Sequence, residues 1–138
     1  MIRRCYTAIA TLWLIACSGA PADSISWLRY EPAIVQLTGV LEVVQEYGPP
    51  NWGDDPLNDE KLRVPVLRLS EPVNISGDSH SDINTESFEN VREVQLQLDG
   101  YDSLVGKRVT VSGTLFAGHT GWHFKSVVMS VKVIQPIR

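Results

Sequence analysis

The side chains best suited to binding gather in two glycine-containing stretches of the chain, residues 47–56 and 118–124. Each stretch contains one tryptophan, Trp52 in the first and Trp122 in the second. A large aromatic ring that stays exposed on a protein surface usually contacts a ligand or a partner. We therefore predict a binding site that comprises Tyr47, Asn51, Trp52, His119, Thr120, Trp122 and His123. The alternative is that the two indoles pack inward and only close one end of the fold.

The two histidines of the second stretch raise the question of a metal site. His119 and His123 are four residues apart, a spacing that aligns two ligands on a helix. The glycines around them predict a loop, in which the spacing loses that meaning. Asp54 in the first stretch is the carboxylate that could complete a zinc site. We keep these three residues as an alternative metal site and predict no metal or cofactor.

The sequence offers no arrangement for nucleophilic catalysis. It has no Gly-x-Ser-x-Gly motif and no phosphate-binding glycine loop. The only cysteines are Cys5 and Cys17, both close to the N-terminus. Adjacent acids such as Asp54 and Asp55 are typical of a solvated loop. We therefore predict that the protein is not an enzyme.

The N-terminus has the pattern of an export signal. A positive start, residues 1–4, precedes an uncharged apolar run that is too short to span a bilayer. Leu14-Ile-Ala-Cys17 resembles the bacterial lipobox, which implies cleavage before Cys17 and its lipidation. We therefore expect a signal peptide at 1–16, a tether at 17–29 and a domain at 30–138. The alternative is ordinary cleavage after Ala22, which leaves no lipid anchor.

The charge balance disfavours one class of partner. The formal net charge is −4, and the loss of Arg3 and Arg4 with a cleaved signal leaves −6. Proteins that bind nucleic acids draw most of their affinity from basic groups that neutralise phosphates. We expect no nucleic-acid partner.

Apolar residues alternate with polar ones in five runs of the chain, at 33–44, 62–73, 91–98, 107–116 and 127–134. Strict alternation predicts half-buried strands. In the last run, this pattern places Val127, Met129, Val131 and Val133 inward. Gly39 and Gly113 lie on the apolar faces of two runs, where a missing side chain lets a strand bend or admits a neighbouring backbone.

These elements predict an all-β fold, a small five-stranded OB-like Greek-key barrel with a helical turn within 99–105. An open β-sandwich is the alternative. In an OB barrel, the loop after the first strand and the loop before the last lie near one mouth. We therefore expect residues 47–56 and 118–124 to lie side by side.

Several short motifs occur in the order found in one protein family. The chain resembles the DUF4431 domain family of bacterial exported proteins at Tyr30-Glu-Pro32, Thr38-Gly39, Gly48-Pro-Pro-Asn51, Val91–Leu96, Leu104–Phe116 and His119-Thr-Gly121. The resemblance implies an exported β-barrel-like domain. The family's function is unknown, so the resemblance assigns no catalytic residues.

These observations predict a non-catalytic binding module of the cell envelope. We expect an exported, periplasmic protein on the outer membrane, which contacts the membrane only through a lipid at Cys17. The expected partner is an envelope or secreted protein, and one form of this function is inhibition of, or immunity against, an envelope-active toxin or hydrolase. The alternatives are a periplasmic protein that binds a small ligand or metal, and a structural envelope lipoprotein.

Overall fold

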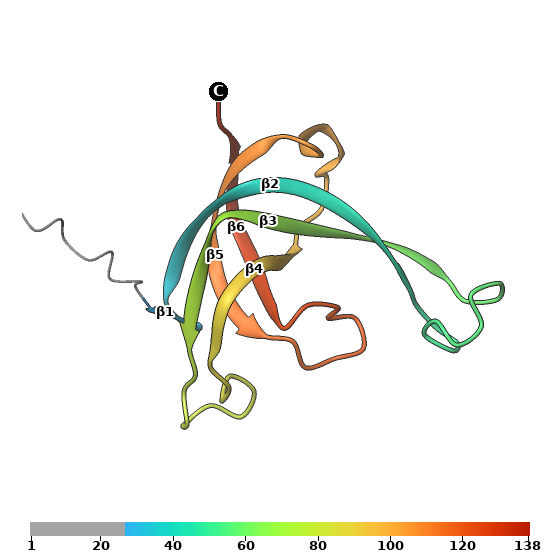
Figure 1. Ribbon diagram of the computed structural model, residues 1–138, viewed down its shortest axis with the longest axis horizontal. Helices are drawn as coiled ribbons and strands as arrows, with labels where there is room; N and C mark the ends of the chain where they lie inside the picture. The colour runs from blue at the N-terminus through green and yellow to red at the C-terminus, as the bar shows by residue number, and fades with distance from the viewer. Residues whose placement is uncertain (1–26) are drawn as a thin grey trace, which may run out of the picture.

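The computed structural model of the protein describes residues 27–138. The predicted signal peptide, Cys17 and the first part of the predicted tether therefore lie outside the described residues. The elements are β1 (Trp27–Arg29), β2 (Ile34–Tyr47), β3 (Lys61–Ser76), β4 (Phe88–Gln97), the 3-10 turn η1 (Asp102–Leu104), β5 (Arg108–Ala117) and β6 (Val127–Pro136) (Figure 1). No helix within these residues has the length and apolar character needed to cross a membrane.

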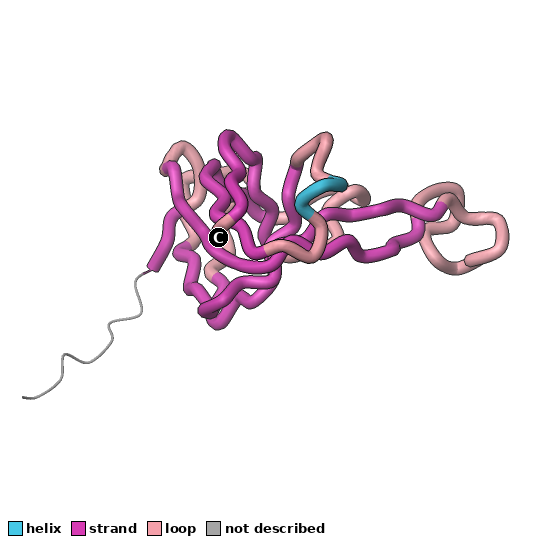
Figure 2. Tube along the Cα trace, turned by 90° about the horizontal axis from the view of Figure 1, so that it is seen from above, coloured by secondary structure: helices cyan, strands magenta, loops and turns pink. Residues whose placement is uncertain are grey.

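The five long strands form a ring. The sheet order is β1-β3-β2-β5-β6-β4, and an additional β3–β4 pairing closes it. All neighbours in the ring are antiparallel except β4 and β6, which run parallel. This is the OB-like Greek-key order, so the predicted fold class is confirmed. The ends of β2 and β3 leave the ring as a projecting hairpin (Figures 1 and 2).

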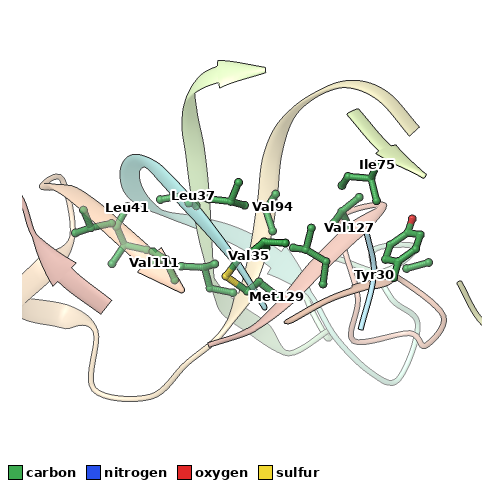
Figure 3. Close-up of a cluster of buried hydrophobic side chains, with 14 residues drawn as sticks. Tyr30, Val35, Leu37, Leu41, Ile75, Val94, Val111, Val127 and Met129 are labelled. Atoms are coloured by element: carbon green, nitrogen blue, oxygen red, sulfur yellow. The ribbon is translucent and has the colours of Figure 1, made fainter. Parts of the chain in front are cut away.

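Inward-facing side chains of all five long strands fill the barrel. Leu41, Leu67, Val94, Val111 and Met129 are fully buried, as the alternation predicts, and Figure 3 shows this cluster. Tyr101 and Leu104, beside and within η1, pack against the same core. The turn ends at Leu104, and Val105, which follows it, is exposed.

Two glycines allow the strands to approach closely. A Cβ atom on Gly39 would lie 2.2 Å from the carbonyl oxygen of Arg68, and one on Gly113 would lie 2.1 Å from that of Ser130. Real Cβ atoms do not approach a backbone oxygen so closely. The neighbouring backbones therefore occupy the space of the missing side chains, as predicted from the sequence.

A bulge in β6 corrects one part of the predicted pattern. Ser112 pairs with Val133 and Gly113 with Val131, so Lys132 is an extra residue on β6. The extra residue reverses the alternation beyond it. Val133, predicted to face inward, is 50% exposed, and Ile134 packs against the core instead.

The strand boundaries also differ from the predicted runs. Trp27–Arg29, expected in the tether, forms β1 and pairs in parallel with β3. The run predicted from residue 62 begins at Lys61 and continues to Ser76. Pro65 is compatible with it because residues 61–65 pair with β2 alone, so the strand lies at an edge there.

A second set of buried side chains lies on the outer face of the barrel. Val66 pairs with Gln95, Gln95 with Val128, and Val128 with Phe116, so the four side chains form one row across the sheet. Val66 adjoins the inward-facing Leu67 and therefore points outward. All four residues are buried, although they do not belong to the interior cluster. Some other part of the chain must cover them.

Candidate functional site

The β2–β3 loop (48–60) and the β5–β6 loop (118–126) meet through their tryptophans. The ring centroids of Trp52 and Trp122 lie 5.1 Å apart, with an angle of 75° between the ring planes. Such an edge-to-face contact is a favoured geometry for aromatic pairs. The two loops emerge toward the same side of the molecule (Figure 1). The structure thus brings together the two stretches expected to be neighbours.

Both tryptophans remain accessible to solvent. Trp52 is 43% exposed and Trp122 is 51% exposed. Each indole therefore packs on the other loop while it presents much of its surface outward. The alternative, in which the rings pack inward to close the barrel end, does not describe this arrangement.

The backbone of Trp52 adopts an unusual conformation. Its φ angle is 55°, in the left-handed region that side chains other than glycine seldom adopt. Holding a bulky residue there costs about 1–2 kcal/mol. Backbone strain of this kind is common at functional sites, where the surrounding structure enforces it.

Gly121 provides the surface on which Trp52 rests, a role that the sequence did not predict. A Cβ atom at Gly121 would lie 3.1 Å from Cη2 of Trp52 and 3.3 Å from its Cζ2. A larger residue at this position would push the indole away. The lack of a side chain at position 121 therefore helps the two loops to meet.

A single carboxylate organises the β2–β3 loop. Asp59 is buried, and its Oδ1 accepts the backbone N–H of Asn51 at 2.7 Å. Its Oδ2 accepts those of Gly53 at 2.7 Å and Asp55 at 3.2 Å. The strained segment around Trp52 is thus bound on both sides to one side chain.

These hydrogen bonds also set the ionisation of Asp59. Burial is the largest single influence and raises the pKa of its carboxyl. The hydrogen bonds from Asn51, Gly53 and Asp55 together outweigh burial, so the pKa is lowered below its ordinary value. The loop is therefore built around an ionised carboxylate.

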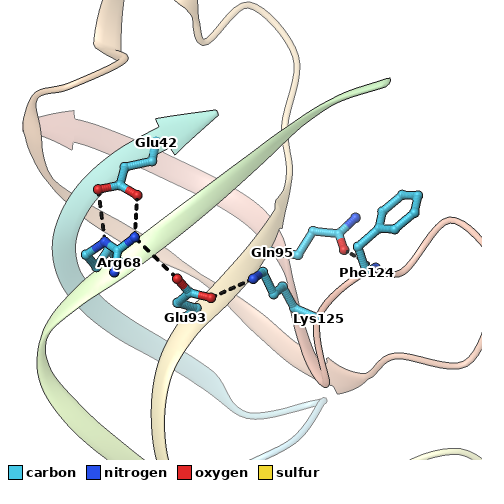
Figure 4. Close-up of polar contacts among 6 residues, drawn as sticks. All are labelled: Glu42, Arg68, Glu93, Gln95, Phe124 and Lys125. Atoms are coloured by element: carbon cyan, nitrogen blue, oxygen red, sulfur yellow. Dashed lines mark hydrogen bonds and ion pairs between the residues drawn. The ribbon is translucent and has the colours of Figure 1, made fainter. Parts of the chain in front are cut away.

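The β5–β6 loop is the covering of the outer face. From β4, Gln95 Nε2 donates to the carbonyl of Trp122 at 2.9 Å, and Gln95 Oε1 accepts the N–H of Phe124 at 2.7 Å (Figure 4 shows the latter bond). The ring of Phe116 contacts the rings of His119 and His123, with centroids 5.8 and 5.2 Å away. The loop thus lies over Gln95 and Phe116 at two places along the buried row.

A line of alternating charges also reaches this loop (Figure 4). Arg68 on β3 makes two hydrogen bonds of 2.9 Å to Glu42 on β2. It also lies 3.4 Å from Glu93 on β4, which in turn binds Lys125 of the loop. The loop is therefore attached to the sheet by an ion pair as well as by Gln95.

The two histidines have structural roles in the loop. His119 Nδ1 lies 2.9 Å from the carbonyl of Ala117 and donates to it, which fixes the tautomer. His123 Nδ1 accepts the backbone N–H groups of His119 at 3.1 Å and Thr120 at 3.3 Å. Burial, followed by the nearby His119, lowers the pKa of His123. The neutral ring is therefore the form that holds the loop.

The hydrogen bonds of His123 bear on the alternative metal site. Neutral His123 has one lone pair on its ring nitrogens, at Nδ1, and the two backbone N–H groups occupy it. Asp54 is exposed on the other loop. Among residues 27–138, no group of three or more histidines, cysteines or acids is close enough to hold a metal ion.

The remaining predicted site residues lie on the same two loops. Tyr47 ends β2, is half-buried and lies against Gly53, where a Cβ atom would be 3.8 Å from the tyrosine side chain. Asn51 is exposed, and its backbone binds Asp59. Thr120 is exposed, and its Oγ1 accepts the N–H of Trp122 at 3.3 Å. These residues therefore shape the loops that carry the two indoles.

The fold and the loops define an OB-like barrel protein whose outer face is covered by its own β5–β6 loop. Residues 93–135, from β4 to β6, match the family model described as "Domain of unknown function (DUF4431)". The predicted resemblance to this domain is thereby confirmed over that segment. Neither the comparison with curated proteins nor that with solved structures found a match.

Proposed function

We propose that this protein is a non-catalytic binding module that holds a protein partner at the surface formed by Trp52 and Trp122. One observation carries the proposal: two half-exposed indoles from separate loops contact each other, and hydrogen bonds hold the backbone of each loop in place. Tryptophan is among the residues that most often dominate the energy of protein interfaces. A rigid aromatic surface loses little conformational freedom on binding, which favours affinity.

The covered outer face supports a protein partner over a nucleic acid. OB barrels commonly bind oligonucleotides on the face of the second and third strands, between the two loops. The corresponding strands here are β3 and β4, and Val66 and Gln95 on that face are buried. The protein is acidic overall, so it has no excess of basic side chains to neutralise the phosphates of a nucleic acid. The outer surfaces of the loops are therefore the better contact site.

We place this function in the cell envelope. The support is the basic, apolar and lipobox-like pattern of the N-terminus, which lies outside the described residues. In this proposal the chain is an exported, periplasmic lipoprotein, and lipid at Cys17 anchors the domain to the outer membrane. The partner is an envelope or secreted protein. Inhibition of, or immunity against, an envelope-active toxin or hydrolase is one concrete form of this function.

The experiment compares binding partners of the wild type with those of the double variant Trp52→Ala with Trp122→Ala. Purified proteins are immobilised and exposed to envelope extracts, and retained proteins are identified and then measured singly. We expect the double variant to bind the specific partner at least tenfold more weakly, since interface hot spots typically contribute about 2 kcal/mol or more.

Trp27→Ala is the matched control. Trp27 is also exposed, at 47%, but it belongs to β1 rather than to either loop. It should leave binding unchanged. If the double variant retains the same partners with the same affinity, the proposed site is refuted.

A further inference from the structure

Leu57 is the most exposed large apolar residue of the described chain, at 94%. It lies on the β2–β3 loop that also carries Trp52. The backbone carbonyl of Asp55 accepts the N–H groups of Asn58 at 3.0 Å and Asp59 at 2.9 Å. These bonds close a tight turn around Leu57. The turn therefore holds an apolar side chain in water, where it gains nothing for the fold.

The position of this loop makes the exposure significant. Figure 2 shows the β2–β3 hairpin reaching beyond the packed strands, with its loop at the far end. The loop is ordered by hydrogen bonds from Gly48 N to Glu60 O and from Glu60 N to Pro49 O, at 2.8 and 3.0 Å. It is also bound to Asp59, as described above. A preformed projection of this kind is well suited to enter a cleft.

The charge around Leu57 indicates the chemistry of that cleft. From residue 46 to residue 61 the acidic side chains are Glu46, Asp54, Asp55, Asp59 and Glu60, and the basic one is Lys61. Arg63, the next cation along β3, pairs with Asp102 at 2.9 Å. Carboxylates disfavour insertion into an anionic lipid surface, whereas they attract a basic protein surface.

We propose that the β2–β3 loop inserts Leu57 into an apolar cleft with a basic rim on the partner protein. This inference rests on the proposed function and extends its site from the two indoles to the end of the hairpin. Leu57 supplies the buried anchor. Asp54 and Glu60, both exposed on the same loop, supply the complementary charge. Trp52 and Trp122 form the adjoining part of the same interface.

The test begins with a photo-cross-linking amino acid at position 57 of the full chain, in cells that express it. Position 36, where Gln36 is exposed on β2 within the barrel, is the matched control. The protein that cross-links at 57 and not at 36 is purified.

The affinity of this purified partner is then measured for the wild type, Leu57→Ser, Trp52→Ala, and Asp54→Asn with Glu60→Gln. Asp82→Asn with Glu89→Gln, exposed acids elsewhere, controls for charge.

We expect Leu57→Ser to weaken binding about tenfold or more, as the loss of one buried leucine implies. Neutralising Asp54 and Glu60 should slow association and reduce its salt dependence, and the charge control should do neither.

If Trp52→Ala weakens binding while Leu57→Ser does not, this inference fails and the proposed function stands. If both variants bind like the wild type, both fail. Cross-linking at 57 only to lipid or to a second copy also overturns the inference, as does binding of the wild type to phosphatidylglycerol vesicles that Leu57→Ser abolishes.

Discussion

His123 shows how one side chain maintains the surface presented by a loop. Its Nδ1 accepts two backbone N–H groups only when the ring is neutral. The ring centroids of His119 and His123 lie 4.9 Å apart, so His119 is a titratable side chain in direct contact with the His123 ring. Because these bonds hold the β5–β6 loop, the protonation state of His123 affects the position of Trp122, which directly precedes it in the chain.

The first prediction concerns pH. Because the folded state lowers the pKa of His123, its contribution to stability is complete above the ordinary value of about 6.5 and declines as the pH falls through the folded pKa. We expect the melting temperature to fall as the pH drops below about 6.5, and the near-ultraviolet circular dichroism of the Trp52–Trp122 pair to weaken as the folded ring gains its proton.

His123→Asn separates this effect from other titrations, because an amide oxygen accepts hydrogen bonds without titrating near neutrality. The variant should lose much of the pH dependence of the tryptophan signal. His119→Asn is the comparison, since it leaves the acceptor at position 123 in place. If the wild type and His123→Asn show the same pH dependence of the tryptophan signal and of the melting temperature, the assigned role is contradicted.

The second prediction concerns Asp59. In Asp59→Asn, an amide NH2 replaces one of the two oxygens that together accept three backbone N–H groups. A donor then faces a donor, so the segment around Trp52 should lose its conformation. We expect loss of the tryptophan-pair signal and faster amide exchange at 51–55, with the barrel still folded. Asp54→Asn, an exposed acid on the same loop, should have neither effect.

At the scale of elements, the β5–β6 loop belongs to the core of the protein as much as to its surface. It covers a row of side chains on β3, β4, β6 and β5, and Gln95 is the buried polar residue in that row. The ion pairs through Arg68 and Lys125 are partly exposed, and solvent screens such pairs, so they stabilise the loop only weakly. The loop's attachment therefore depends chiefly on Gln95 and on the apolar contacts.

The third prediction follows from this dependence. Gln95→Leu leaves the carbonyl of Trp122 and the N–H of Phe124 without their partner. A fully buried unsatisfied group costs about 1–3 kcal/mol. These two bonds are only partly buried, so we expect a loss in the lower part of the summed range, about 2–4 kcal/mol, in the free energy of unfolding. Urea denaturation measures it. Gln97→Leu, an exposed position on the same strand, should change stability little.

For the whole molecule, closure of the ring depends on how closely β5 and β6 approach. The bulge at Lys132 and the contact at Gly113 occur at the same place between these strands. Bulges and glycines are the usual means by which a sheet bends enough to close. The bulge and the glycine contact therefore contribute to the curvature that closes the ring.

The fourth prediction tests closure. In Gly113→Ala, the new Cβ atom would lie 2.1 Å from the carbonyl oxygen of Ser130, and neither backbone can move without breaking the pairing. We expect a loss of about 3 kcal/mol or more in the free energy of unfolding, measured in urea. Ser112→Ala, at the adjacent half-buried position, is the control. Equal stability of Gly113→Ala and the wild type would show that closure does not depend on this contact.

Some features of the protein follow from neighbouring residues alone. Alternation located the five long strands, and Gly39 and Gly113 indicated where backbones approach. The Greek-key order then predicted that the loops of Trp52 and Trp122 meet. Alternation failed where it was interrupted: the bulge at Lys132 changed the face of Val133. Three-residue β1 was too short to show a pattern.

The sequence by itself determined which residues alternate along each strand, because that pattern depends only on the geometry of an extended chain. It also contained a sign of the covered face in the consecutive apolar residues 64–67, 115–117 and 127–129, which are typical of strands buried on both sides. Only the tertiary structure decided that the β5–β6 loop is the cover, that Asp59 binds the backbone around Trp52, and that Leu57 stays in water. These outcomes depend on contacts between segments far apart in the chain, and no local pattern specifies which distant segment will cover a given face.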